Sequence, residues 1–289
     1  MKSADTKPSS RASEVRAALC NEIAAALQAV WEHRRPGDAT VHEVRKDLKR
    51  ARAALRLLRE AVGDATYARE NAELRDAARP LAGVRDAAVT LEAVDELLDQ
   101  EKKPARRALL LDLRRSLVEE RRRARRKLVR GRGLSGIALT LQDAGQRVEY
   151  WRVPREDIPV LRAGFERVYR KGRKALKKAR AEGTTESLHE SRKQAKYLHQ
   201  ALSVIALRKS GRLAKAAKRA QAVADGLGED HDLAVLQARL AALPAGAPPA
   251  KKLLKRIQSR RTKLQRNALK QAQRLYSRKP AAFLDRVLG

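Results

Sequence analysis

The chain has 289 residues and carries 66 Lys and Arg against 34 Asp and Glu, a formal net charge of +32. Hydrophobic residues make up 43% of the chain, which is enough for a core and excludes wholesale disorder. The single cysteine, Cys20, excludes an internal disulfide framework and any cysteine-built metal site. Two Phe, two Trp and five Tyr offer few rings for stacking on bases, so a phosphate backbone is a better expected partner than a base.

Segments rich in Ala, Leu, Arg and Lys follow one another along the chain, and Val and Ile are too scattered to give alternating strands, so an all-α fold is predicted. Residues 1–11 are predicted to be a disordered tail. Residues 12–150 and 151–289 are predicted to be two helical halves, divided near Pro154 and Pro159. The predicted helices cover residues 12–34, 40–60, 65–79, 83–100, 103–130, 134–149, 159–181, 187–208, 210–226, 230–242 and 249–278.

The C-terminal helix is expected to be strongly basic on one face. A Pro/Gly loop at 244–249 precedes it, and residues 251–279 carry 12 basic side chains and no acidic one. An apolar stripe nevertheless runs along this segment, which favours a docked helix over a loose arm. The stripe consists of Leu253, Leu254, Ile257, Leu264, Ala268 and Leu275.

An internal repeat is the most informative feature of the sequence. Residues 40–49 return as residues 187–196, with the histidine, the glutamate, the arginine and both lysines at matching places. Further along, residues 81–89 match residues 227–235, where the step Arg85-Asp86 corresponds to His231-Asp232. Two units of similar plan are therefore predicted, rather than a long solenoid.

Each unit opens with the pattern of a helix N-terminus. Thr40 with Glu43, and Ser187 with Glu190, are spaced three residues apart as in a capping box. This spacing would place the two histidines in the first turn of their helices, beside free backbone amides.

On a helical wheel, each unit shows an apolar stripe next to a basic one, so one face is predicted to pack and the next to bind. The basic residues of the first unit are His42, Arg45, Lys46, Lys49, Arg52 and Arg56. Those of the second unit are His189, Arg192, Lys193, Lys196 and His199.

A solvated basic face is the simpler interpretation of these stripes, but the energetics favour an anion site. Like charges three or four residues apart cost about 0.2–0.5 kcal/mol each, and the pairs of the first unit together cost on the order of 1–3 kcal/mol. Cations in a first turn also oppose the helix dipole, and a bound oxyanion would reverse both penalties. No metal site is predicted, because no second histidine or carboxylate follows either histidine on the same face. No catalytic set is predicted either, because no nucleophile or paired carboxylate recurs.

Four further residues are candidates for the site or its support. Asp86 and Asp232 break the basic pattern at matching places, and we expect them to form structural ion pairs or, as the alternative, to orient the histidine or arginine of the site. Arg173 and Lys174, just before the second repeat, are expected to border the same cleft.

These residues resemble the CHAD family, the conserved histidine α-helical domain. The pattern is a histidine followed by an arginine three positions on and by a further Arg or Lys, occurring twice. His42, Arg45, Lys49 and Arg50 match the first copy; His189, Arg192, Lys193 and Lys196 match the second. The resemblance implies two four-helix bundles related by a pseudo-twofold axis, with a basic central cavity that binds inorganic polyphosphate. Lys46, where an apolar residue is common, and His231, in place of an arginine, depart from the pattern.

The predicted function is therefore non-catalytic binding of polyphosphate, without a cofactor or metal. Binding of nucleic acid through the same basic surface is the alternative, and polyphosphate processing ranks third. The opening of the chain shows no secretory signal, and its uncharged runs are shorter than the roughly 20 residues that span a bilayer. A cytoplasmic protein is expected, on polyphosphate granules, at the nucleoid or free, and the sequence leaves its oligomeric state open.

Overall fold

The computed structural model describes residues 10–130, 133–153, 158–205, 211–242 and 248–288. Within these ranges the chain forms twelve helices and no strand, which confirms the all-α prediction. Residues 1–9 of the predicted tail lie outside the described residues. Arg11 already belongs to the first helix, because the side chain of Ser10 accepts a hydrogen bond from the amide of Ser13 and caps it.

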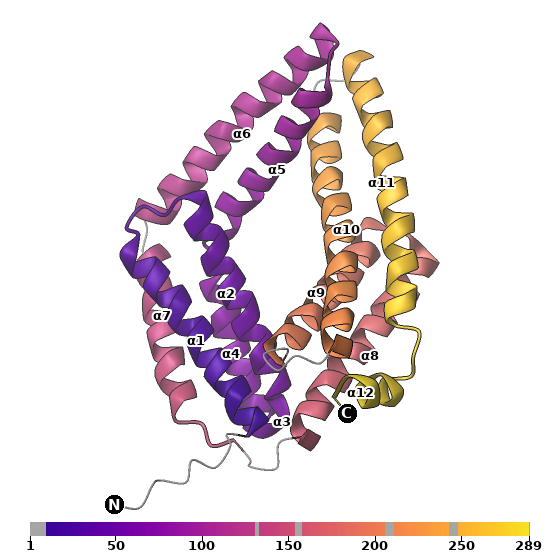
Figure 1. The fold of residues 1–289 in the computed structure, drawn as a ribbon. Coiled ribbons are helices and arrows are strands. Elements are labelled where there is room, and N and C mark those ends of the chain that lie inside the picture. Colours follow the sequence, from indigo (N-terminus) through magenta and orange to yellow (C-terminus); the bar gives the residue numbers. More distant parts are fainter. Residues whose placement is uncertain (1–9, 131–132, 154–157, 206–210, 243–247, 289) are drawn as a thin grey trace, which may run out of the picture.

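The helices follow one another through short connections. They are α1 (Arg11–Glu32), α2 (Asp38–Leu57), α3 (Arg59–Val62), α4 (Asp64–Ala77), α5 (Ala82–Gln100), α6 (Pro104–Arg130), α7 (Gly133–Glu149), α8 (Ile158–Glu182), α9 (Thr185–Ile205), α10 (Gly211–Ala241), α11 (Pro248–Leu275) and α12 (Pro280–Leu288). Two pairs of long helices, α5 with α6 and α10 with α11, lean toward each other and converge at their far ends (Figure 1).

The prediction of two helices over 210–226 and 230–242 is wrong, since α10 runs through both without a break. Two glycines near the predicted boundary, Gly226 and Gly228, lie at close helix contacts. A Cβ on Gly226 would be 3.3 Å from the Cβ of Ala268 in α11, and one on Gly228 would be 3.4 Å from Nε of Arg192 in α9. Glycine is used here because it lets α10 approach its two neighbours closely.

The basic C-terminal segment is a docked helix, as predicted, but it ends earlier than expected. Leu253 and Ile257 of α11 are buried, and its Arg261 forms a buried ion pair with Asp230 of α10 at 2.9 Å. After Leu275 the chain turns into α12, a helix that the sequence analysis missed. Residues 244–247 of the predicted loop lie outside the described residues.

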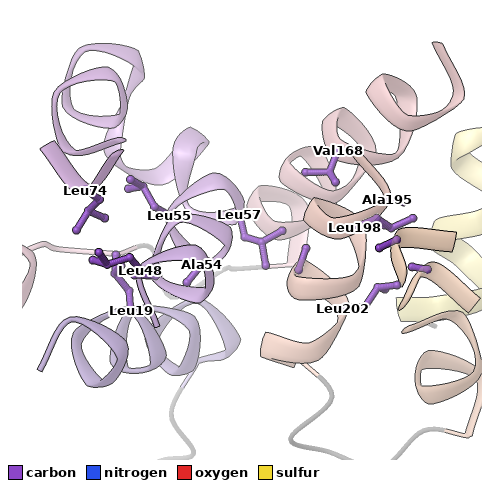
Figure 2. Packing of buried hydrophobic residues seen from close by; sticks show 14 of the residues in the cluster. Leu19, Leu48, Ala54, Leu55, Leu57, Leu74, Val168, Ala195, Leu198 and Leu202 are labelled. Carbon is purple, nitrogen blue, oxygen red and sulfur yellow. The ribbon is translucent and has the colours of Figure 1, made fainter. Parts of the chain in front are cut away.

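Two apolar clusters hold the helices together. The larger cluster spans both halves of the chain, and Figure 2 shows Leu48 and Leu55 of α2 on one side and Leu198 and Leu202 of α9 on the other. The smaller cluster joins the far ends of α5, α6, α10 and α11. The apolar stripes of the two repeats are therefore core faces, as predicted, and each leaves the neighbouring basic stripe of its helix outside the core. The pseudo-twofold relation of the two halves stays a prediction.

The crossing of α8 over α2 depends on one glycine. A Cβ at Gly164 would lie 2.7 Å from the carbonyl oxygen and 2.8 Å from Cα of Leu57, which are backbone atoms that cannot rotate away. We expect Gly164→Ala to lower the free energy of unfolding by about 1–3 kcal/mol, the usual cost of overpacking.

The matched control is Gly145→Ala in α7, where the nearest atom to an added Cβ is a methyl carbon of Ile23 at 3.6 Å. This change should raise stability by up to about 1 kcal/mol, because alanine is the better helix former. Urea unfolding of both variants checks the pair, and equal midpoints would contradict the close contact.

Candidate functional site

Helices α2 and α9 carry the two repeats, and the structure corrects how each of them begins. The N-cap residue of α2 is Gly37, and that of α9 is Thr184, whose hydroxyl accepts a hydrogen bond from the amide of Ser187 at 3.2 Å. The predicted capping boxes at Thr40 and Ser187 are therefore wrong. The first turn of α2 contains Asp38, whose negative charge favours a helix N-terminus and which pairs with Arg121 of α6 at 3.0 Å.

This earlier start removes the backbone amides from the expected anion site. The helical hydrogen bonds Val41 N–H to Gly37 O and Leu188 N–H to Thr184 O, both 3.0 Å, are already formed just before the two histidines. The glutamates of the predicted boxes bind lysines instead, Glu43 with Lys46 at 2.8 Å and Glu190 with Lys193. Any anion at these helices must be held by side chains.

The second lysines of the two repeats come together where α2 and α9 cross. Burial and the positive charges of Lys196, Arg45, Arg192 and Arg85 lower the pKa of Lys49 to about 7. Burial and Arg192 likewise lower the pKa of Lys196, while the carboxylates of Asp225 and Asp232 partly oppose that shift. Cations from α2, α5 and α9 thus converge on one point, although like charges repel there.

The arginines of the two repeats are left with unused donors. Nε of Arg45 and Nε of Arg192 are both buried, and neither has a hydrogen-bond acceptor among the described residues. Arg45 uses a terminal nitrogen to donate to the carbonyl of Ala78 at 3.3 Å, and its pKa is lowered by desolvation. Buried donors without partners cost free energy, so their occurrence at two equivalent positions points to an absent acceptor.

The two histidines have equivalent neighbours in the two halves. The pKa of His42 is lowered by partial desolvation and by Arg85, and the pKa of His189 by partial desolvation and by His231, whose ring centroid lies 4.9 Å from its own. His231 therefore occupies in the second half the place that Arg85 occupies in the first. The first half thus has a guanidinium at this place, and the second half has an imidazole.

Neither aspartate of the repeat forms an ion pair with an arginine among the described residues. The charge of Asp86 opposes the lowering of the pKa of Arg45 that desolvation causes, and Asp232 lies 3.3 Å from Nδ1 of His231. The expected structural ion pair is therefore not found at Asp86 in the described part of the chain, whereas Asp232 contacts His231; a role of either aspartate in orienting the site stays a prediction.

Two adjoining hollows open onto this cluster; together we call them the central basic cavity. The first is about 420 Å³ and is lined by residues of α1, α2, α9 and α10, which include His42, Lys46, Lys49, Arg50, Lys196 and His199. The second is about 340 Å³, shares Lys196 and Asp225 with the first, and adds Arg192. Its outer wall is acidic and consists of Glu92, Glu96, Glu229 and Asp232. The structure thus brings most of the residues predicted from both repeats to one place.

Seven of the predicted basic residues line neither hollow: Arg45, His189 and Lys193 lie beside the cluster, and the other four lie elsewhere. Arg52 donates to the side chain of Asn71 in α4 at 3.0 Å, and Arg56 lies over the ring of Tyr197 at 3.7 Å. Arg173 is a positive neighbour of the buried Tyr169, and Lys174 is exposed on α8. None of these four lines either hollow of the central basic cavity.

Some residues of the cluster escaped the site prediction. Arg85 and His231 belong to the second sequence match but were not predicted as site residues, and Asp225 lies outside both matches. All three lie on α5 or α10, the helices that contain the second match or lead into it, and this position could have indicated a place at the site. Among the described residues no group of three or more His, Cys, Asp or Glu could hold a metal ion. No helix in the described part of the chain is long and apolar enough to cross a membrane.

The profile of the CHAD domain matches residues 18–241, and the chain belongs to this family. The family is known for its association with polyphosphate. Among solved structures, PptA from Streptomyces chartreusis superimposes with a TM-score of 0.64 at 16% identity, covering 94% of this chain and 98% of that one. The CHAD domain from the plant Ricinus communis gives a TM-score of 0.61 at 17% identity, covering 97% and 92%. No curated protein matches the chain.

Proposed function

We propose that this chain binds inorganic polyphosphate in the central basic cavity and does not cleave it. Arg45, Arg192, Lys49 and Lys196 bind successive phosphates, while His42 and His189 act as further donors at the edge. Lys46, Arg50 and Lys193 add positive charge around them, and His199 lines the first hollow. The observation that carries this proposal is the pair of buried, unpaired Nε donors at equivalent positions of the two repeats.

A chain of phosphates fits this arrangement chemically. Hydrogen bonds between a guanidinium and a phosphate oxygen are charge-assisted and about twice as strong as neutral ones. The anion would also relieve the repulsion that lowers the pKa of Lys49 and Lys196. A cytoplasmic protein, free or on polyphosphate granules, follows from this ligand.

Competition between polyanions tests the proposal against its nucleic-acid alternative. We expect long-chain polyphosphate to displace duplex DNA at equal phosphate concentration and fixed salt, because the Nε donors of Arg45 and Arg192 are buried, whereas DNA reaches only exposed charges. Fluorescence anisotropy of a labelled oligonucleotide measures the displacement.

Displacement of bound polyphosphate by DNA at equal phosphate concentration would contradict the proposal and support the alternative. Release of orthophosphate from polyphosphate by the purified chain, measured in parallel, would contradict the non-catalytic part of it.

A further inference from the structure

A third hollow lies on the other side of α9 from the central basic cavity. Gln194, which lines it, is two positions from Lys196 and so points about 160° away from it around the helix axis. Its walls come from α2, α3, α4, α8 and α9. The lining residues are Arg56, Arg59, Tyr67, Gly164, Arg167, Val168, Lys171, Gln194 and Tyr197.

The lining of this hollow has four cations and no carboxylate. Arg59 is neutralised from outside by Asp64 at 2.6 Å, and Arg167 by Glu60. Arg56 and Lys171 have no carboxylate within ion-pair distance among the residues that the structure describes. Two positive charges therefore stay uncompensated at a site with no acidic group in its wall.

Arg56 is the most constrained of these cations. Its guanidinium lies 3.7 Å from the ring centroid of Tyr197, and one terminal nitrogen donates to the carbonyl of Arg52 at 2.8 Å. Desolvation is the main cause that lowers its pKa. The ring and the backbone carbonyl thus hold the guanidinium in place, while its charge lacks a counter-ion.

The size of the hollow limits what it takes. Its volume is about 50 Å³, whereas one water molecule needs roughly 10–15 Å³ on the same scale. The hollow therefore has room for a few water molecules or for one tetrahedral oxyanion in their place. The hydroxyl groups of Tyr67 and Tyr197 and the guanidinium nitrogens are donors suited to its oxygens.

We propose that this hollow is a separate site for one tetrahedral phosphate, either the free ion or the phosphoryl group of a small ester. Arg56 and Lys171 bind it, and Arg59 and Arg167 hold the surrounding walls positive. The site does not depend on polyphosphate binding in the central basic cavity, because the two hollows have no lining residue in common.

Titration of the full chain with orthophosphate at constant ionic strength, followed by 31P NMR, tests the site. We expect Lys171→Gln to raise the dissociation constant on the order of fivefold, as loss of one partly solvated charge does. Arg56→Gln should abolish this binding. The matched control is Lys177→Gln, an exposed lysine of the same helix that does not line the hollow.

The exposed position of Lys171 keeps the test valid even if the Arg56 variant does not fold. Equal dissociation constants for the wild type and Lys171→Gln would overturn the proposal. So would loss of orthophosphate binding on Lys49→Gln, which would assign the ion to the central basic cavity. Glycerol phosphate in place of orthophosphate distinguishes the sources: binding with the same dependence on Lys171 indicates an ester, and no binding indicates the free ion.

Discussion

The double variant Arg45→Gln with Arg192→Gln should lose at least about 100-fold in affinity for long-chain polyphosphate. Each guanidinium is expected to make a charge-assisted hydrogen bond that contributes about 1.5–3 kcal/mol, and two such losses correspond to roughly 10²–10⁴ in the dissociation constant. The fold should persist, because the buried Nε atoms make no hydrogen bond in the free chain, and Arg45 loses only its long bond of 3.3 Å to the carbonyl of Ala78. Isothermal titration calorimetry at fixed salt measures the loss.

A control of equal charge separates a specific site from general attraction. Arg123→Gln with Arg126→Gln removes the same two charges from the exposed face of α6, away from the central basic cavity. We expect this variant to bind within a few-fold of the wild type. Equal losses in the two double variants would assign binding to net charge and exclude the assigned site.

The second large effect is a dependence of binding on pH that arises from Lys49. Its pKa is lowered from 10.5 to about 7 in the free folded chain, so about half of the molecules have a neutral amine at neutral pH. A bound polyanion favours the protonated amine, and binding above pH 7 must therefore take up a proton. The affinity should fall roughly tenfold per pH unit above 7 for one linked proton.

The same shift gives the sign of the stability change in the free chain. Below pH 7 the amine is protonated in both the folded and the unfolded states, and the folded state carries the full penalty of the buried charge. Between about pH 7 and 10.5 only the unfolded state binds the proton, so the free energy of unfolding rises with pH.

Lys49→Met removes the titrating group while keeping a long side chain. This variant should unfold at higher urea than the wild type at pH 6.5, yet bind polyphosphate more weakly and with a flatter pH profile above 7. Titrations in buffers of different ionisation enthalpy count the protons taken up. An unchanged proton count in the variant would show that another group carries the linkage.

The two halves differ in the neighbours of their histidines. In the second half His189 and His231 face each other, with Asp232 beside His231, and the other charges near His189 are those of Arg192, Lys193 and Glu190. The first half has Arg85 at the place of His231. The departure from the family pattern at this position therefore changes the chemistry of one half only.

Much of the candidate site could be predicted from the sequence, because the residues of each repeat lie within a single helix. The spacing of His42, Arg45 and Lys49 within one helix determines that they share a face, whatever lies around it. The same reasoning wrongly included Arg52 and Arg56 in the binding face. Those residues lie further along α2, where α4 and α9 are the neighbours rather than the cavity.

The sequence by itself determined the all-α fold, the duplicated basic helices and the core stripes beside them, because these depend on composition and on a period of 3.6 residues. Only the tertiary structure decided that Lys49 meets Lys196, that Arg85 and His231 complete the cluster, and that the histidines lie past the free amides. Such contacts join residues far apart in the chain, and the packing of α2, α5, α9 and α10 sets them. The charge of +32 indicated a polyanion as partner. The packing of the helices decided which of those positive charges are buried without a counter-ion.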